Sequence, residues 1–350
     1  MQSAWYNSPV MRAARREPVD RTPIWLMRQA GRYMPEYRAI RQRTAFLALC
    51  KNPDLCAEIA VDAAQRLKVD AAILFSDLLL ILEPMGLRLE FGDSEGPLLA
   101  NPIRTPADAD RLLELETLEP LHHVMEAVEK TRAALPESTP LIGFAGAPFT
   151  LAAYAIEGGS SRDYRLTKSL MYGDLGAWNA LLGRLARAVA LYLNAQIAAG
   201  AQLVQMFDSW AGSLGVDDYC RCVLPHTQAV IESIPPDVPV IHFHTGNPAL
   251  LPYIKKAAGS RSNLVVGIDW RMRLGDAWQT IGYDTAIQGN LDPAALLSSP
   301  AEIHRQAQAI LDQAAGRPGH IFNLGHGVLP QTPVENAIAL VEAVHELSRR

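Results

Sequence analysis

Short apolar runs recur along the chain and are separated by longer amphipathic stretches. Most of the runs are continuously apolar and do not alternate with polar residues, which is typical of strands buried on both faces of a sheet. The pattern therefore predicts eight buried strands. They occupy residues 23–27, 71–77, 141–148, 202–209, 239–245, 263–269, 286–290 and 320–327.

The stretches between these runs have helical periodicity. The segment "PDLCAEIAVDAAQRLK" (53–68) places apolar side chains every four residues, which puts them on one face of a helix. That face consists of Leu55, Ile59, Ala63 and Leu67.

A second helix is predicted in "TPVENAIALVEAVHELSRR" (332–350). Thr332 has the properties of an N-cap, and Pro333 suits the first turn. Glu335, three residues after Thr332, would complete a capping box.

Eightfold alternation of strand and helix predicts an α/β fold, a (β/α)8 TIM barrel in one domain over residues 1–350. An open doubly wound sheet is the alternative, but no G-x-G-x-x-G follows the first run. Residues 1–17 form an N-terminal arm. Two long connections, 29–52 and 78–120, are predicted as loops at the C-terminal face of the strands, and "GLRLEFGDSEGP" (86–97) as a hairpin-like excursion on the rim.

Composition indicates an ordinary globular protein, with 49% apolar residues and a formal net charge of −5. This acidity argues against general nucleic-acid binding, which requires a basic field. No apolar run approaches the ~20 residues that cross a bilayer, and the N-terminus lacks the apolar core of a signal peptide. We therefore expect a cytoplasmic enzyme without nucleic-acid or membrane partners.

The cysteines form no C-x-x-C pair, and Cys220 and Cys222 are too close in sequence for an ordinary zinc knuckle. We expect all four to be reduced and mostly structural. They are Cys50, Cys56, Cys220 and Cys222.

Polar residues stand at the ends of the predicted strands, and in a barrel of this kind the C-terminal strand ends form the active site. The segment "LMRQAGRYMPEYRAIR" (26–41) concentrates four arginines directly after the first run, although the chain is acidic. An anionic ligand entering this mouth is the simplest explanation. The strand-end residues are Arg28, Asp77, Pro148, Thr150, Asp208, Ser209, His244, Asp269, Asn290 and His326.

Several segments together resemble the uroporphyrinogen decarboxylase family. The two longest are "PIWLMRQAGRYMPEYR" (23–38) and "GFAGAPFTLAAYAIEGG" (143–159). "LFSDLL", "FDSWAG", "HFHTG" and "NLGHGVLP" follow in the order of that family, so the resemblance spans the chain from about Pro18 to its end.

The resemblance implies a carboxy-lyase that removes four acetate carboxyl groups from uroporphyrinogen III, giving coproporphyrinogen III and CO2 in haem and tetrapyrrole synthesis. It also implies a homodimer that uses neither a metal nor an organic cofactor. This chemistry needs cations for many carboxylates, an acid for a pyrrole ring carbon and a negative group beside the pyrrolic N–H groups.

The resemblance assigns the negative group to Asp77, which would be both catalytic and substrate-binding. An N-cap role is equally compatible with its strand-end position. Arg28 and Arg32 would bind substrate carboxylates, because the planar guanidinium matches a carboxylate with two hydrogen bonds. Arg28 is also our preferred proton donor, and Arg41 is a weaker candidate for binding. Arg38 and Arg43, by contrast, are expected to belong to a solvated basic loop.

Four further residues complete the expected site. Tyr154 would orient the reacting acetate or Asp77, and Ser209 would contact a carboxylate. His326 would bind a propionate or carry a proton, and Phe207 would form apolar wall for the macrocycle. The alternatives are a core position for Tyr154 and a rim position for His326.

Three other functions compete with this interpretation. A zinc-dependent methyltransferase on the same barrel would carry H-x-C late in the barrel, whereas this chain reads "HFHTG" there. A tetrapyrrole-binding protein without catalysis would keep the arginines but not need Asp77. A phosphate-binding barrel enzyme would show a glycine-rich turn leading into a short helix, which residues 323–330 lack.

Overall fold

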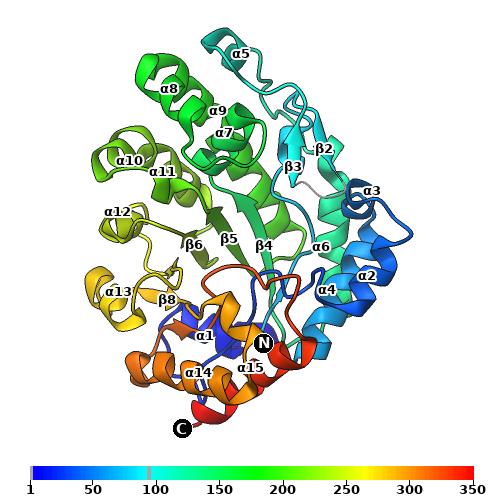
Figure 1. Ribbon diagram of the computed structural model, residues 1–350, viewed down its shortest axis with the longest axis vertical. Coiled ribbons are helices and arrows are strands. Elements are labelled where there is room, and N and C mark those ends of the chain that lie inside the picture. The colour runs from blue at the N-terminus through cyan, green and yellow to red at the C-terminus, as the bar shows by residue number, and fades with distance from the viewer. Residues whose placement is uncertain (1–2, 93–95) are drawn as a thin grey trace.

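A curled parallel sheet forms the centre of the molecule (Figure 1). The computed structural model describes residues 3–92 and 96–350. Seven strands pair in parallel in the order β1-β4-β5-β6-β7-β8-β9. Within this sheet the strands therefore lie side by side in the order in which they occur in the chain. They are β1 (Ala72–Ile73), β4 (Leu141–Gly146), β5 (Leu203–Asp208), β6 (Val240–His244), β7 (Leu264–Gly267), β8 (Ala286–Gln288) and β9 (His320–Ile321).

The first predicted strand, residues 23–27, forms no ladder and contributes only an isolated parallel bridge between Ile24 and Phe322. Pro23 has no N–H to donate. The N–H groups of Leu26 and Met27 donate to side chains, Gln29 Oε1 at 3.2 Å and Asn323 Oδ1 at 3.0 Å. Because these N–H groups have side-chain partners, residues 23–27 do not form a strand ladder. The other seven predicted strands form.

Hydrogen bonds nevertheless hold residues 23–27 between the two ends of the sheet. On the β9 side the Phe322 N–H donates to Pro23 O at 2.8 Å, and on the β1 side the Asp70 N–H donates to Ile24 O at 2.8 Å. Inside the sheet the Trp25 indole donates to Gln288 Oε1 at 2.9 Å, and the Gln288 amide donates to Gln205 at 3.0 Å. These buried side chains connect the segment with β5 and β8.

Helices surround the sheet (Figure 1). In the figure, α7–α13 cover one side, α4 and α6 the other, and α14 and α15 lie near the chain ends. The α-helices are α1 (Pro9–Ala14), α2 (Pro35–Arg41), α3 (Phe46–Cys50), α4 (Pro53–Leu67), α5 (Pro106–Asp110), α6 (His122–Ala134), α7 (Pro148–Glu157), α8 (Arg165–Gly173), α9 (Leu175–Ala198), α10 (Val216–Cys222), α11 (Leu224–Ser233), α12 (Leu251–Lys256), α13 (Leu274–Ile281), α14 (Pro300–Ala314) and α15 (Val334–Leu347). Short 3-10 turns are η1 (Ala4–Asn7), η2 (Leu80–Leu82), η3 (Glu119–Leu121), η4 (Ala211–Ser213), η5 (Pro248–Leu250) and η6 (Pro293–Leu297).

Helix α4 confirms the predicted helix at 53–68. Its N-cap is Asn52, whose Oδ1 accepts from the Leu55 N–H at 3.1 Å, and Pro53 occupies the first turn. Of the predicted apolar face, Ile59, Ala63 and Leu67 are buried and Leu55 is half-buried. The 3.6-residue period therefore identified the buried side correctly.

Helix α15 forms as predicted, but the capping box at its start is wrong. The N-cap is Pro333, one residue later than expected, so Thr332 lies outside the helix. The buried Thr332 hydroxyl has no hydrogen-bond partner among the described residues. With this shift Glu335 occupies the second helical position, where it cannot complete the box.

The two long connections contain secondary structure of their own. Residues 29–52 hold α2 and α3, and residues 78–120 hold η2, α5, η3 and an antiparallel pair, β2 (Leu89–Phe91) and β3 (Pro97–Leu99). This pair confirms the predicted hairpin, although residues 93–95 of its turn lie outside the described residues. The N-terminal arm, described from residue 3, forms η1 and α1, and α1 contacts β9.

The cysteines are free, and three of the four are buried. Burial raises the pKa of Cys56 to about 12 and the pKa of Cys50 further still. These thiols are therefore protonated near neutral pH, as expected of structural cysteines.

Candidate active site

Most of the predicted site residues lie on loops or on helix α7, after the C-terminal ends of neighbouring strands. Arg28 follows residues 23–27, Asp77 follows β1, Tyr154 is on α7 after β4, Ser209 follows β5 and His326 follows β9. In parallel strands these ends share one edge of the sheet, which we call the mouth. The charge of Arg28 acts to lower the pKa of Asp77, Tyr154 and His326, so these three groups lie within electrostatic reach of its guanidinium.

Asp77 is a partly exposed carboxylate, and one of its two oxygens accepts a hydrogen bond from the protein. Its Oδ1 accepts from the Leu79 N–H at 2.9 Å and so closes the turn before η2, but the N-cap of η2 is Leu79, and Asp77 is therefore not the helix N-cap of the alternative interpretation. Within the described residues its Oδ2 accepts no hydrogen bond. Burial raises the pKa of Asp77 to about 6, although the Leu79 N–H and the Arg28 charge act in the opposite direction. Oδ1 of Asp77 therefore holds the local turn, while Oδ2 is available to a ligand.

Arg28 projects from a strained backbone position. Its φ is +59°, a left-handed conformation that is costly for a residue with a Cβ and that often marks functional sites. The side chain is exposed, and its guanidinium has no hydrogen-bond acceptor among residues 3–92 and 96–350. A guanidinium whose donors are free, within electrostatic reach of the Asp77 carboxylate, is suited to bind an anionic group.

His326 is placed by the two glycines on either side of it. A Cβ at Gly325 would lie 2.5 Å from the Trp270 backbone nitrogen, and a Cβ at Gly327 would lie 2.6 Å from Cγ of Arg28. Both neighbours can approach only because the side chains are missing. Burial, Arg28 and Arg271 lower the pKa of His326 to about 4, so the imidazole is neutral near pH 7.

A methyl group at Gly327 should displace Arg28 and leave most of the molecule unchanged. We expect Gly327→Ala to lower kcat/KM about tenfold, because the arginine stem must move to admit the Cβ and its charge leaves Asp77. Steady-state kinetics and thermal melting measure this. A matched change at Gly173, where a Cβ meets open space, serves as control. Full activity of Gly327→Ala would show that the position of Arg28 is unimportant.

Tyr154 lies on α7 with its ring stacked on Trp210, at 3.8 Å between centroids and an interplanar angle of 29°. Burial and the charge of Asp77 raise the pKa of Tyr154 to about 12, so its hydroxyl is a neutral donor. Within the described residues this hydroxyl makes no hydrogen bond, and it makes none to Asp77. The structure therefore leaves it available to a ligand and does not use it to orient Asp77.

Aromatic rings form one wall of the mouth. Phe207 on β5 contacts Phe144 and Phe243 edge to face, with centroids 5.7 and 5.8 Å apart. Phe144 and Phe243 are buried and Phe207 is partly exposed. Phe207 thus presents the accessible apolar surface, while Phe144 belongs to the core.

Ser209 is partly exposed beside this wall. Its carbonyl oxygen accepts from the Thr245 hydroxyl at 2.6 Å, which fixes its backbone. The Ser209 hydroxyl has no partner among the described residues. A small donor on a fixed backbone can contact a carboxylate at low entropic cost.

The other two predicted arginines lie further along the 29–52 connection. Arg32 is exposed just before α2, and its guanidinium has no acceptor in the described part of the chain. Arg41 is half-buried, donates to Thr44 O and lies 5.6 Å from the Phe46 ring centroid. The guanidinium of Arg41 therefore has local partners, whereas that of Arg32 is free.

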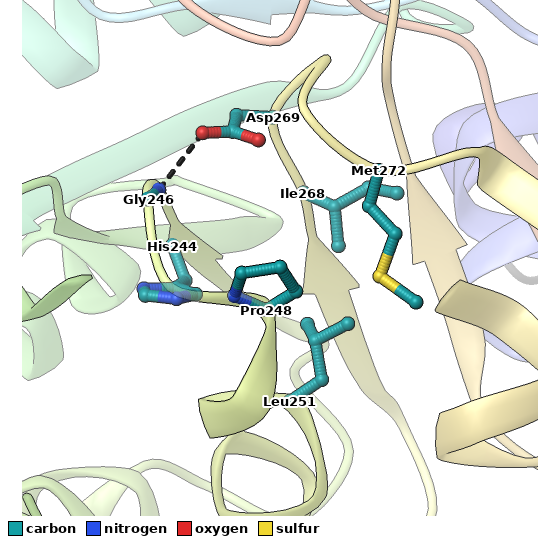
Figure 2. Close-up of a pocket in the computed structure, with 7 residues that line it drawn as sticks. All are labelled: His244, Gly246, Pro248, Leu251, Ile268, Asp269 and Met272. Carbon is teal, nitrogen blue, oxygen red and sulfur yellow. Dashed lines mark hydrogen bonds between the residues drawn. The ribbon is translucent and has the colours of Figure 1, made fainter. Parts of the chain in front are cut away.

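The sequence interpretation missed one cation, Arg271. Its guanidinium pairs with Asp269, packs at 4.3 Å on the Trp270 ring and lowers the pKa of His326. Asp269 also accepts from the Gly246 N–H at 2.8 Å (Figure 2). The sequence did offer a signal for Arg271, because it stands two residues after the strand-end residue Asp269.

The remaining strand-end residues join loops to one another. Asn290 donates to Asp269 O at 2.9 Å, and a ring nitrogen of His244 lies 2.9 Å from Asn247 O. His244 and Asp269 also line a small cavity with Pro248, Leu251, Ile268 and Met272 (Figure 2). These residues stabilise the rim between β6 and β8. Among residues 3–92 and 96–350, no group of three or more histidine, cysteine or acidic side chains is arranged to hold a metal ion.

Comparisons with known proteins agree on one family. The family model described as "Uroporphyrinogen decarboxylase (URO-D)" matches residues 6–347. A protein of Sorangium cellulosum named uroporphyrinogen decarboxylase is 52% identical over 340 residues, covering 97% of this chain and 96% of the relative. One of the same name from Roseiflexus sp. is 50% identical over 348 residues, covering 98% and 99%.

A solved structure described as a methyltransferase from Methanosarcina mazei has a TM-score of 0.80, with 99% of each chain covered. At 19% identity this similarity concerns the fold alone. None of the helices in the described part of the chain combines the length and apolarity needed to cross a bilayer.

Proposed function

The chain belongs to the uroporphyrinogen decarboxylase family, and from this premise we propose that the mouth decarboxylates the four acetate side chains of uroporphyrinogen III. The product is coproporphyrinogen III, an intermediate of haem and tetrapyrrole synthesis. One observation supports the proposal above all: among the described residues, Asp77 keeps an oxygen without a hydrogen-bond partner, and its charge acts within electrostatic reach of the Arg28 guanidinium and the Tyr154 hydroxyl.

Each decarboxylation consumes one proton. Protonation of the ring carbon makes the pyrrole a cation. The bond between the acetate methylene and its carboxylate then breaks, CO2 leaves, and the electron pair neutralises the ring as an exocyclic methylene. A proton added to this methylene gives the methyl group and regenerates the cation, which loses the ring-carbon proton.

Asp77 stabilises the cationic stage. Its free oxygen accepts pyrrolic N–H groups, and charge-assisted hydrogen bonds of this kind contribute roughly 1.5–3 kcal/mol each. Because the ring carries positive charge only along the reaction path, the carboxylate stabilises the transition state more than the bound substrate. This differential binding accelerates the reaction without a cofactor.

The arginines bind the carboxylates of the substrate. Arg28 and Arg32 have donors free for this role, and Arg271 adds a third cation that acts on His326. Arg41 contributes less, since its guanidinium already has local partners. Arg28 also delivers the ring proton, through water, because a guanidinium is itself a poor acid.

The neutral groups orient the macrocycle. Tyr154 donates to the reacting acetate and Ser209 to another carboxylate. The neutral imidazole of His326 binds a propionate and relays protons, and Phe207 contacts the face of a pyrrole.

We propose the remaining features of the architecture from the same family membership. Residues 23–27 complete a single-domain (β/α)8 barrel over residues 1–350, which their hydrogen bonds to Phe322 and Asp70 support. The enzyme is a cytoplasmic homodimer, for which sedimentation equilibrium gives a direct test of the subunit number.

An anaerobic assay with uroporphyrinogen III tests the function. The products are oxidised and separated by chromatography, and we expect the seven-, six- and five-carboxyl intermediates followed by the four-carboxyl product. A protein that retains the porphyrinogen on a column but releases it with all eight carboxyl groups would be a binding protein, contrary to the proposal.

The pH dependence should report the ionisation of Asp77. Its pKa in the ligand-free protein is about 6 and its active form is the carboxylate, so kcat/KM should fall as the pH drops below about 6. His326, with a pKa of about 4, is neutral throughout this range. Rates at substrate concentrations well below KM, between pH 5 and pH 8, measure the effect. Tyr154→Phe should be slower but show the same decline, while a flat profile in the unmodified enzyme would exclude Asp77 as the titrating group.

A further inference from the structure

A fully buried carboxylate lies directly behind the mouth, at the end of β5. Asp208 has no exposed surface, and its Oδ1 accepts from the Thr150 hydroxyl at 3.1 Å. Its Oδ2 has no hydrogen-bond partner among the described residues. His242 Nε2 is 3.6 Å away from that oxygen, beyond ordinary hydrogen-bond distance. The chemistry proposed above does not use this carboxylate.

Thr150 connects Asp208 with the mouth in two ways. Its hydroxyl also accepts from the Trp210 N–H at 3.4 Å, just beyond Ser209 on the β5 loop. It lies in the first turn of α7, four residues before Tyr154 and therefore on the same side of the helix. The Trp210 ring stacks on Tyr154. A continuous series of contacts therefore runs from Asp208 through Thr150 and Trp210 to Tyr154.

Stability alone gives a poor reason for a carboxylate at this position. A buried charge with incomplete hydrogen bonding destabilises a fold relative to an apolar residue of similar size. Met206, two residues earlier on the same strand face, is fully buried, and His242, 3.6 Å from the free oxygen, is too far away to donate a hydrogen bond to it. The group that this carboxylate does bind is the Thr150 hydroxyl, which links α7 to the β5 loop.

We propose that Asp208 and Thr150 are positioning residues for the reaction, holding Trp210 and α7 so that the hydroxyls of Tyr154 and Ser209 point into the mouth. This inference rests on the proposed function, since it assigns a role in that reaction. It predicts that losing the Thr150 hydroxyl impairs the reaction through Tyr154 and Ser209 and not through general unfolding.

Thr150→Val removes the hydroxyl and keeps the shape. We expect kcat to fall about tenfold with a smaller change in KM, because a displaced Tyr154 no longer orients the acetate that reacts. Thr150→Ser restores the hydroxyl and should restore kcat. Thr131→Val is the matched control: Thr131 is also fully buried, and its hydroxyl donates to Ala127 O at 2.6 Å in α6, away from the mouth.

A double-mutant cycle with Tyr154→Phe separates positioning from simple destabilisation. If Thr150 acts through Tyr154, Thr150→Val should lower kcat much less in the Tyr154→Phe background than in the unmodified enzyme. Equal factors in both backgrounds, or a kcat loss in Thr131→Val as large as in Thr150→Val, would overturn the proposal. Should Thr150→Val not fold, Asp208→Leu combined with Thr150→Val removes the same hydrogen bond without an orphaned carboxylate.

A crystal structure of the Thr150→Val variant gives a readout independent of activity. We expect the Trp210 ring to have left its stack on Tyr154, and an unchanged stack would overturn the inference. If the unmodified protein produced no coproporphyrinogen, the proposed function would fail, but this structure would still test the positioning contacts.

Discussion

Asp77→Asn should reduce kcat about a thousandfold, the range seen when a single preorganised electrostatic group is removed from an active site. The amide keeps an oxygen for the Leu79 N–H but places no negative charge beside the pyrrole cation. Binding of the substrate should change much less, since the arginines remain. Single-turnover rates and equilibrium binding under anaerobic conditions measure the two effects separately. Near-normal turnover would remove Asp77 from its assigned role.

The same substitution should make the protein more stable near neutral pH. The pKa of Asp77 is raised in the folded protein to about 6, above its ordinary value of 3.8, so the fold disfavours the ionised form. This penalty is absent below the ordinary pKa, grows as the pH rises toward 6 and is complete above it. Asparagine should remove at most about 3 kcal/mol of destabilisation at pH 7.5.

Denaturant unfolding at pH 7.5 and pH 4 tests this sign. The variant should gain stability over the unmodified protein at the higher pH, and the gain should shrink at the lower one. A variant less stable at pH 7.5 would mean that the folded protein does not penalise the Asp77 charge. Asp269→Asn is a useful contrast, because that carboxylate has a cationic partner in Arg271 and should lose stability.

Arg28→Ala should lower kcat/KM by about two to three orders of magnitude. The substitution removes a cation whose charge acts to lower the pKa of both Asp77 and His326, and its donors have no acceptor among the described residues. Both kcat and KM should suffer, since the guanidinium binds a carboxylate and assists proton delivery. Steady-state kinetics at several ionic strengths measure the loss.

Arg43→Ala is the matched control for Arg28→Ala. Arg43 is an exposed arginine of the same connection whose single hydrogen bond, to Ala39 O, is long at 3.4 Å. It should retain normal kinetics, as expected of a solvated basic loop. Equal effects of the two substitutions would indicate that only the overall charge of the loop matters.

The periodicity of apolar residues predicted the fold well because burial on both faces is visible in the sequence. It failed at residues 23–27, where hydrogen bonds from Leu26 and Met27 to the side chains of Gln29 and Asn323 replace a strand ladder. Those partners are three and 296 residues away. No local pattern reveals the contact with Asn323, which is distant in the sequence. The capping box at Thr332 failed for a related reason, since a one-residue shift of the helix start changes every capping position.

The site could be predicted to the extent that strand ends meet at one edge. Asp77, Ser209 and His326 follow strands, and the structure places each at the mouth. Their position did not indicate that Asp77 shares one oxygen with the Leu79 N–H, or that Arg271 approaches His326 from β7. Both depend on loop conformations, and the close approach of Gly325 to the Trp270 backbone helps to set the second.

The central claim is that the free oxygen of Asp77 stabilises a pyrrole cation through its N–H groups. A crystal structure with coproporphyrinogen III, kept reduced during soaking, tests it most directly. We predict a carboxylate oxygen of Asp77 within about 3 Å of the pyrrole nitrogens, with the macrocycle against Phe207. A product bound with its nitrogens turned away from Asp77 would contradict the account.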